Sequence, residues 1–399
     1  MYMPSRRLQK RAQEMIPLSA PELCGNEWLY VKECLDTGWV SSVGTYVHRF
    51  ERDMAAYLGV RHAVATVNGT SALHVALRVA GVRPGDEVLV STLTFIASVN
   101  AIHYCGAHPV FMDSERISWN MDPAKVAEFL SRECRVRRGR LVNRRTGRRV
   151  AAILPVHILG HPTDMAPILE AAGRAGIPVI EDAAESLGAL YRGRPVGTLG
   201  DVACLSFNGN KIMTCGGGGM IVTPRERWAQ SARHLTTQAK ADATEYLHDE
   251  IGYNYRLVNV LAALGVAQLE RLPEFIRKKR KIAHRYETAL SSFDGLTPMP
   301  EAPWARSTFW LYTILVNRSF FAASAREVVR ILGQRGVQAR PIWYPIHRQP
   351  MYRKAQAYRI EVADDLHRRG LSLPCSVGLS VEAQDRVVSE LRRLAERAA

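Results

Sequence analysis

The sequence predicts an α/β fold in which a mostly parallel sheet between helices is followed by a smaller C-terminal α+β part. Short apolar runs alternate with segments whose apolar residues recur at helical spacing. From about Leu269 the chain changes to longer charged helices with one clear strand, T-F-W-L-Y-T-I-L-V. A chain of 399 residues with 47% hydrophobic content can form two domains. We therefore expect a large domain over residues 15–268 and a small domain over 269–399.

The predicted strands of the large domain are short and almost entirely apolar, as expected for strands that are buried on both faces. They cover residues 62–67, 87–91, 108–113, 151–157, 177–182 and 202–207. Apolar spacing predicts helices between them, over residues 72–80, through Ile102, and over Pro123–Phe129 and Met165–Ala175. The turn N-G-T-S connects the first strand to the first helix.

The N-terminus and the cysteines indicate where the protein resides. Residues 1–14 form a basic tail that lacks the apolar core of a signal peptide. No run approaches the roughly 18 consecutive apolar residues that a membrane span needs. The seven cysteines form neither a metal-type C-x-x-C pair nor a disulfide framework. We expect a soluble cytoplasmic protein with no membrane partner and no metal site.

Much of the net charge of +15 is concentrated in residues 132–149, which carry nine arginines and one glutamate. We expect a basic hairpin insertion at about 132–150, with a turn near Asn143 to Gly147. Aromatic residues are absent from this insertion, which favours a solvent-exposed loop without a binding role over a nucleic-acid site. Steering of an anionic small substrate remains open. A second basic run, Arg277 to Lys281, is expected on the solvent-exposed face of a helix.

Lys211 and Asp182 are the candidate catalytic pair. Lys211 follows the strand 202–207 in the loop S-F-N-G-N-K, and Asp182 ends the strand 177–182, where open parallel sheets bind their ligands. A deprotonated lysine attacks carbonyls, and a carboxylate can pair with a pyridine nitrogen. Taken alone, Asp182 could cap a helix and Lys211 could be solvated. Together they favour pyridoxal phosphate held on Lys211 as a Schiff base.

A phosphate-binding turn is expected where the first strand becomes the first helix. Gly69, Thr70 and Ser71 offer backbone N–H groups and two hydroxyls at the positive end of the helix dipole. The same residues could cap a helix with nothing bound. Ser206 and Asn208 precede Lys211 closely enough to approach the phosphate from the other side. Glycines 216–219 would let the backbone pass close to the cofactor.

Seven motifs, in this order, resemble the DegT/DnrJ/StrS family of nucleotide-sugar aminotransferases, from about Ile16 to the C-terminus. They are V-N-G-T-S-A-L-H-V-A-L, S-T-L-T-F-I-A-S-V-N-A, L-P-V-H-I-L-G, I-E-D-A-A-E-S-L-G-A, S-F-N-G-N-K, G-G-G-G-M-I-V and G-Y-N-Y-R-L. This resemblance implies a fold-type I aminotransferase. N-E-W-L-Y-V-K-E-C-L-D-T-G-W-V-S-S-V-G, H-I-L-G-H-P-T-D-M, T-T-Q-A-K and the basic hairpin most resemble the branch that serves legionaminic-acid-type sugars.

The resemblance also implies roles for individual residues. Lys211 would hold the cofactor and move the proton, Asp182 would pair with the ring nitrogen, and Glu185 would lie near the phenolic oxygen. Phe95 would stack on the ring. The phosphate would be held by Thr70, Ser71 and Ser206. Asn254 would reach the phosphate of a neighbouring subunit, which implies a homodimer with shared active sites. Residues expected to touch substrate are Trp39, His157, Tyr344 and His347.

The expected reaction moves an amino group from L-glutamate to C4 of a nucleotide-linked 4-keto-6-deoxy sugar, with a pyridoxamine phosphate form between the two half-reactions. The legionaminic branch implies a UDP-linked 2-acetamido sugar of the legionaminic-acid or bacillosamine type. A GDP-linked substrate, as in perosamine synthesis, is a close competitor. Sugar 3-dehydratases of this fold carry a histidine in place of Lys211, so they fit less well. A non-catalytic regulator of the same fold is the other alternative.

Overall fold

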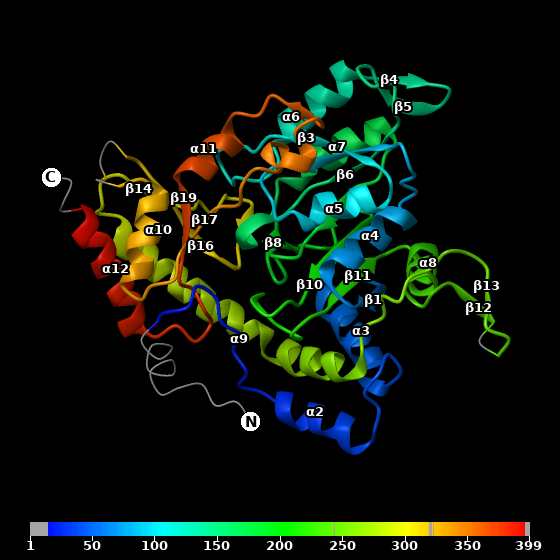
Figure 1. Ribbon diagram of the computed structural model, residues 1–399, viewed down its shortest axis with the longest axis horizontal. Coiled ribbons are helices and arrows are strands. Elements are labelled where there is room, and N and C mark those ends of the chain that lie inside the picture. Colours follow the sequence, from blue (N-terminus) through cyan, green and yellow to red (C-terminus); the bar gives the residue numbers. More distant parts are fainter. Residues whose placement is uncertain (1–14, 243, 319–320, 322, 396–399) are drawn as a thin grey trace.

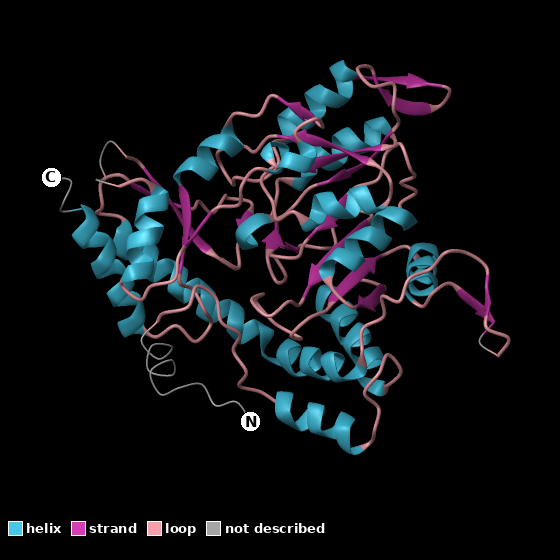
Figure 2. Cartoon of the chain, in the orientation of Figure 1, coloured by secondary structure: helices cyan, strands magenta, loops and turns pink. Residues whose placement is uncertain are grey.

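The computed structural model describes residues 15–242, 244–318, 321 and 323–395 (Figures 1 and 2). The expected basic tail, residues 1–14, lies outside the described residues. A large sheet with helices around it fills one side of the molecule, and a smaller group of strands and helices fills the side near the C-terminus (Figure 1). The long helix α9 extends along both (Figure 1).

The central sheet consists of two four-stranded halves, ordered β1-β11-β10-β7 and β18-β3-β2-β6. Parallel bridges from Ile153 to Val179 and from Val156 to Asp182 join the halves between β6 and β7. β11 runs antiparallel to both neighbours, and the other neighbouring pairs are parallel, which confirms the predicted sheet. The strands are β1 (His62–Thr66), β2 (Glu87–Ser91), β3 (His108–Met112), β6 (Val150–Leu154), β7 (Ile180–Asp182), β10 (Val202–Ser206), β11 (Gly219–Thr223) and β18 (Gln356–Tyr358).

Side chains of the central strands alternate between two cores on opposite faces of the sheet. In β2, Val88 and Val90 belong to the core that includes α4 and α5, whereas Leu89 belongs to the core that includes α6 and α7. Burial on both faces explains why these strands are apolar runs and not alternating patterns. The helices of this part are α2 (Glu27–Asp36), α3 (Thr45–Leu58), α4 (Gly69–Val79), α5 (Ala97–Tyr104), α6 (Pro123–Glu128), α7 (Met165–Ala175) and α8 (Glu226–Thr236).

The C-terminal part contains a second sheet with the order β14-β16-β19-β17, in which all neighbouring strands are antiparallel. The one strand that the sequence predicted here contains β16. The other three have two to four residues each, too short to show an alternating pattern. The elements are β14 (Leu296–Pro298), β16 (Tyr312–Val316), β17 (Arg340–Pro341), β19 (Gly370–Leu373), α10 (Ala325–Gln334), α11 (Val362–Arg369) and α12 (Val381–Ala395).

Helix α9 (Asn259–Leu290) is one helix of 32 residues, and the expected boundary between residues 268 and 269 lies inside it. Near its start, the amide of Gln268 donates a hydrogen bond of 2.6 Å to the carboxylate of Glu27 in α2. Near its end, the hydroxyl of Tyr286 donates to the carbonyl oxygen of Pro374, beside the C-terminal sheet. The same helix therefore contacts both parts of the chain.

Lys279, in the second basic run, does not lie on the solvent-exposed face of α9 as its sequence pattern predicted. Its side chain is buried, and its ammonium group donates hydrogen bonds of 2.6 Å to the carbonyl oxygens of Trp310 and Cys375. Two carbonyl acceptors compensate for the loss of water around a buried cation. The neighbouring Lys278 is partly exposed and pairs with Glu274, as expected for a solvated face.

The basic insertion forms a hairpin that projects from the body of the molecule (Figure 1). Its ladder pairs β4 (Cys134–Arg137) with β5 (Arg140–Asn143). The tight turn is therefore Arg138–Gly139, where both residues have positive φ, and not the segment near Asn143 to Gly147. That segment forms a second turn, which the bridge from Val142 to Arg149 closes.

Short strands complete the described chain. They are β8 (Leu190–Tyr191), β9 (Arg194–Pro195), β12 (Lys240–Asp242), β13 (Leu247–His248) and β15 (Ala305–Arg306). β15 pairs with β8 and so connects the C-terminal part to the large part. Within the residues that the structure describes, no helix combines the length and the apolar character needed to cross a bilayer.

Candidate active site

A cavity of about 790 Å³ lies at the carboxyl ends of the parallel strands, bounded by residues from both parts of the chain. This edge of an α/β sheet is the usual place for a ligand. The volume is within the range of pockets that enclose small molecules. Of the residues that the sequence analysis singled out, the cavity wall contains Gly69, Thr70, Phe95, Asp182, Glu185, Ser206, Asn208, Lys211 and Tyr344.

Lys211 extends into this cavity from the loop that follows β10. Its backbone N–H donates to the carbonyl oxygen of Asn208 at 2.9 Å, which closes a turn. Its Nζ atom lies 4.1 Å from the centre of the Trp310 ring and 3.9 Å from Oε1 of Glu185. Burial lowers the pKa of Lys211, although the Glu185 and Asp182 carboxylates act in the opposite direction. The amine is therefore easier to deprotonate than a solvated lysine, as attack on a carbonyl requires.

Asp182 is the last residue of β7, and its carboxylate is fixed by two donors. The hydroxyl of Ser98 donates to Oδ2 at 2.6 Å, and the backbone N–H of Ala184 donates to Oδ1 at 3.1 Å. Burial raises the pKa of Asp182, against the effect of these hydrogen bonds. A buried carboxylate of this kind gains from a cationic partner, and a protonated pyridine nitrogen is one. The carboxylate therefore fits the ring of pyridoxal phosphate.

Glu185 lies between Lys211 and the backbone of Leu159, whose N–H donates to its Oε2 atom at 2.8 Å. Burial raises the pKa of Glu185 to about 7, the nearby charge of Lys211 acts in the opposite direction, and Asp182 adds a smaller increase. This carboxyl group can therefore be neutral or ionised near neutral pH. Such a group can donate or accept a hydrogen bond beside a phenolic oxygen.

The turn before α4 has the form of an anion cradle. The side chain of Asn68, which the sequence analysis did not single out, caps the helix by accepting a hydrogen bond from the backbone N–H of Ser71. A Cβ atom at Gly69 would lie 2.9 Å from Cβ of Ser206, so only glycine leaves this space open. Thr70 and Ser206 face the resulting cavity, whereas Ser71 is buried and is not part of its wall. A phosphate fits this cradle.

Phe95 and the glycine run also fit a planar cofactor that carries a phosphate. The Phe95 side chain is 57% exposed although it is aromatic, because it lies in the cavity wall just before α5. Its ring is therefore available for stacking on a planar ligand. In the glycine run, Gly218 lines the cavity, and a Cβ atom at Gly219 would lie 2.5 Å from the backbone of Asn68. Gly219 thus allows the anion cradle to approach β11.

Besides Ser71, four predicted site residues lie away from the cavity wall of this chain. His157 is fully buried: Thr163 donates to its Nδ1, so its Nε2 carries the proton and donates to Glu181 at 3.0 Å. His347 shares a hydrogen bond of 2.8 Å with the hydroxyl of Thr92. Trp39 and Asn254 are both exposed.

Other residues of the wall were not anticipated from the sequence. Ser98 lies within a motif that was recognised, but nothing in the spacing marks its hydroxyl as the partner of Asp182. Trp310 was treated as part of a strand, and its indole N–H donates to the carbonyl oxygen of Asn210, 100 residues away. Arg326, Arg340 and His367 reach the cavity from three separate elements of the C-terminal part.

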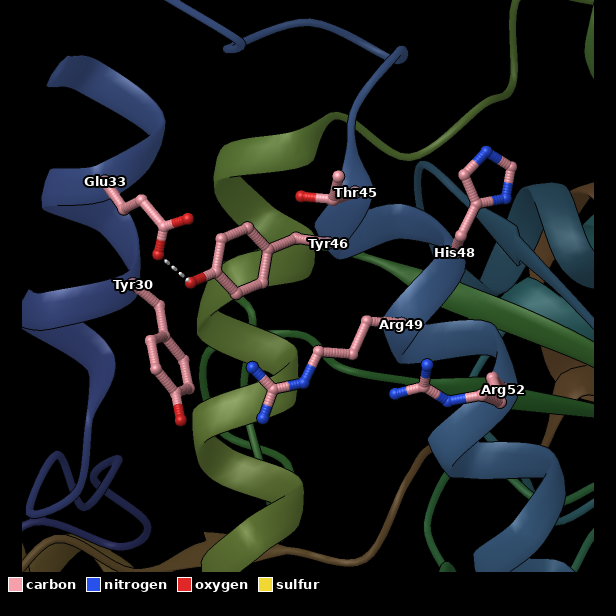
Figure 3. A pocket seen from close by; sticks show the side chains of 7 residues that line it. All are labelled: Tyr30, Glu33, Thr45, Tyr46, His48, Arg49 and Arg52. Carbon is pink, nitrogen blue, oxygen red and sulfur yellow. Dashed lines mark hydrogen bonds between the residues drawn. The ribbon is translucent and has the colours of Figure 1, made fainter. Parts of the chain in front are cut away.

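A second hollow lies between α2, α3 and α9 (Figure 3). Its lining includes Tyr46, whose hydroxyl donates to Glu33 at 2.7 Å, and Arg49, whose guanidinium lies 4.9 Å from the centre of the Tyr30 ring (Figure 3). These groups satisfy one another through a hydrogen bond and a cation–π contact. The hollow shares no lining residue with the cavity of Lys211.

Known proteins resemble this chain over nearly its whole length. GDP-perosamine synthase of Caulobacter vibrioides is 41% identical over 94% of this chain and 97% of its own. The putative pyridoxal phosphate-dependent aminotransferase EpsN of Bacillus subtilis is 40% identical over 95% of each chain. The crystal structure of the aminotransferase TlmJ from Streptoalloteichus hindustanus superposes with a TM-score of 0.86, at 32% identity, over 96% of this chain and 100% of that one.

The model of the DegT/DnrJ/EryC1/StrS aminotransferase family matches residues 22–392, which include both sheets and every wall residue described above. The fold-type I architecture and the use of pyridoxal phosphate follow from this match and from the solved relatives. The chain belongs to the DegT/DnrJ/EryC1/StrS aminotransferase family, and it is a pyridoxal phosphate-dependent sugar aminotransferase.

Proposed function

We propose that this enzyme transfers the amino group of L-glutamate to C4 of a GDP-linked 4-keto-6-deoxy sugar. The main support is the cavity that contains Lys211, Asp182 and Glu185 together, in a chain 41% identical to a GDP-perosamine synthase. The similarity to that enzyme favours the GDP-linked substrate over the UDP-linked 2-acetamido sugar of the legionaminic branch. The UDP-linked substrate was inferred from the resemblance of local motifs to the legionaminic branch, and similarity over nearly the whole chain outweighs it.

The proposed roles of the side chains follow from their positions. When bound, pyridoxal phosphate supplies an electron sink and carries the amino group from one substrate to the other. The Nζ atom of Lys211 takes the proton from Cα of glutamate and later delivers a proton to C4 of the sugar. Asp182 orients the ring through its nitrogen, and Phe95 covers one face of the ring. Thr70, Ser206 and the start of α4 hold the phosphate.

The overall reaction balances without a further reactant. Glutamate loses its amino group and two electrons, takes an oxygen atom from water and becomes 2-oxoglutarate. The sugar gains the amino group and two electrons, and its C4 carbonyl oxygen leaves as water. The partly buried position of Lys211 suits this exchange, because burial lowers the pKa of its amine, which then gives up a proton more readily than a solvated lysine.

We further propose that the chain forms a homodimer with shared active sites. In each copy, the large domain and the small domain that begins near residue 269 would form the site together with residues of the second copy. Asn254 is exposed and lies outside the cavity of its own chain, so another copy would have to receive it. Large apolar side chains on α2 and in the segment after it are also exposed, which suits a protein surface. They are Trp28, Leu29, Leu35, Trp39, Val40 and Val43.

A complementation experiment tests the shared site. Inactive Lys211→Ala and Asn254→Ala variants are unfolded together, refolded as a 1:1 mixture and compared with each variant alone. If the sites are shared, mixed dimers contain one intact site, and about a quarter of wild-type activity returns. A monomer in light scattering, or no recovery in a mixture that has refolded as dimers, contradicts the proposal.

The substrate is tested by incubating the protein, pyridoxal phosphate and glutamate with GDP-, UDP- and dTDP-linked 4-keto-6-deoxy sugars. Mass spectrometry should detect the amino sugar with the GDP substrate and its absence with Lys211→Ala. Amination of the UDP sugar alone would restore the legionaminic-type assignment. Failure with every ketosugar, combined with a DNA gel shift that resists moderate salt, supports the non-catalytic regulator instead.

A further inference from the structure

We propose that Arg326 and Arg340 form an anion-binding pair in the cavity of Lys211, with His367 as the residue that positions Arg326. The proposal rests on the proposed function, because it assigns these residues to the recognition of the two anionic substrates. Neither the comparisons nor the sequence motifs assign a role to any of the three.

Arg326 is held in place by a short chain of hydrogen bonds. The Nδ1 atom of His367 lies 3.0 Å from the carbonyl oxygen of Ile342, which can only accept, so Nδ1 carries the proton. The Nε2 atom of His367 therefore accepts the hydrogen bond of 2.7 Å from the guanidinium of Arg326. A neutral imidazole thus orients the arginine without neutralising its charge, and Tyr344 packs edge-on against the same imidazole.

The charge of the pair is not balanced by the protein. In the described parts of the chain, neither Arg326 nor Arg340 forms an ion pair with an aspartate or glutamate, and both line the cavity. Arg326 is the second residue of α10, but Ser324 and Glu327 already cap that helix. Anion recognition here would come from the two guanidinium groups, because the end of the helix is satisfied.

The pair is connected to Lys211 through aromatic side chains. Nζ of Lys211 lies over the ring of Trp310, and Trp310 stacks on Trp343 with 6.4 Å between ring centres. Trp343 follows Arg340 by three residues, in the loop after β17. The two arginines therefore belong to the C-terminal wall of the cavity, and Asp182 and the anion cradle belong to the wall formed by the large sheet.

The two substrates share one chemical feature at a distance from their reacting carbons. Glutamate carries a side-chain carboxylate, and a sugar nucleotide carries a diphosphate. Both are oxyanions that guanidinium groups bind through paired hydrogen bonds. In a ping-pong reaction the substrates occupy the same cavity in turn, so one arginine pair can serve either or both.

The test compares Arg326→Gln and Arg340→Gln with Arg330→Gln, an exposed arginine on α10 that is not part of the wall. Calorimetry measures the dissociation constants of GDP and UDP. The absorbance change of the bound cofactor on adding glutamate alone measures the first half-reaction. Loss of a charged hydrogen bond should weaken the binding of the affected anion by about 10- to 100-fold. Arg330→Gln should change neither quantity.

Each result decides the proposal. Weaker nucleotide binding assigns the pair to the diphosphate, and a higher glutamate requirement assigns it to the carboxylate. Changes below about twofold in both, in variants with wild-type circular dichroism, overturn it. Both measurements omit the ketosugar, so a wild-type enzyme that aminates no ketosugar contradicts the proposed function without affecting this test.

His367 is examined separately because its effect passes through Arg326. His367→Ala should raise KM for the affected substrate and leave kcat nearly unchanged, since the reacting atoms are not touched. His367→Gln keeps an amide donor and an acceptor and should recover part of the affinity. Equal loss of kcat in both variants, with no change in KM, overturns the positioning role.

Discussion

The hydroxyl of Ser98 donates a hydrogen bond of 2.6 Å to the carboxylate of Asp182. Ser98→Ala removes the shorter of the two hydrogen bonds that stabilise the ionised form of Asp182. A neutral Asp182 pairs poorly with a pyridine nitrogen, so the variant should bind pyridoxal phosphate about tenfold more weakly. Titration of the apoenzyme, followed by cofactor absorbance, measures this. Ser186→Ala is the control, because the buried hydroxyl of Ser186 has no hydrogen-bond partner among the described residues.

Gly69→Ala should disrupt the anion cradle. The added Cβ atom would lie 2.9 Å from Cβ of Ser206, so the turn or β10 must shift. We expect a loss of cofactor affinity and a smaller rise in thermal stability when pyridoxal phosphate is added. Gly173→Ala in α7 serves as the control, because a Cβ atom there meets open space, and alanine should stabilise that helix by about 0.5–1 kcal/mol. Equal cofactor affinity in both variants contradicts the role of Gly69.

Glu185 should make the stability of the apoenzyme depend on pH. Burial raises its pKa in the folded protein from 4.5 to about 7, so the folded state holds a proton that the unfolded state releases. The stabilising effect is complete below pH 4.5 and is lost as pH rises to about 7, on the order of 3 kcal/mol at most. Glu185→Gln removes this loss. Urea unfolding of both apoproteins at pH 5 and pH 7.5 should show a steeper decline for the wild type, and parallel declines contradict it.

Lys279 should contribute to stability through its two carbonyl acceptors. Lys279→Met fills a similar volume but leaves the carbonyl groups of Trp310 and Cys375 without this donor. We expect a loss of about 1–3 kcal/mol in the free energy of unfolding. Lys278→Met changes a partly exposed neighbour on the surface of the helix and should stay within about 0.5 kcal/mol. Two variants of equal stability would show that the buried ammonium contributes nothing.

The basic hairpin should not influence the reaction. It is anchored beside the amino ends of the strands, where Asn143 donates to Glu87 at the start of β2, and the cavity lies at the carboxyl ends. Replacing Arg135, Arg137 and Arg140 by glutamine should leave kcat and KM unchanged at low and moderate ionic strength. A KM that rises in the variant at low salt only would indicate electrostatic steering of the substrate.

The local pattern of apolar residues predicted most of the large sheet, because strands that are buried on both faces are nearly continuous apolar runs. β11 was not predicted as a strand, since it begins at Gly219 inside a glycine run that is typical of a loop. The hairpin turn was misplaced because Arg138, a residue that rarely adopts positive φ, occupies the tight turn. Lys279 was misplaced because its acceptors come from distant loops that helical spacing does not reveal.

The candidate site shows the same division. Lys211, Asp182 and the turn at Gly69 follow strands that the pattern located, so their positions at one edge of the sheet could be predicted. The opposite wall could be predicted only at Tyr344, through the resemblance to the family, because Trp310, Arg326 and His367 come from elements that only the tertiary fold brings together. Their side chains carry no signal that distinguishes them from ordinary core or surface residues.

Strand β18 pairs in parallel with β3 from near the end of the chain. On the ribosome, the exposed backbone of β3 therefore has no partner on that side until residue 358 of 399 has been made. An uncovered strand edge invites pairing with other nascent chains. Expression of a fragment that ends before β18 should therefore give insoluble aggregates, whatever the intrinsic stability of the rest of the sheet.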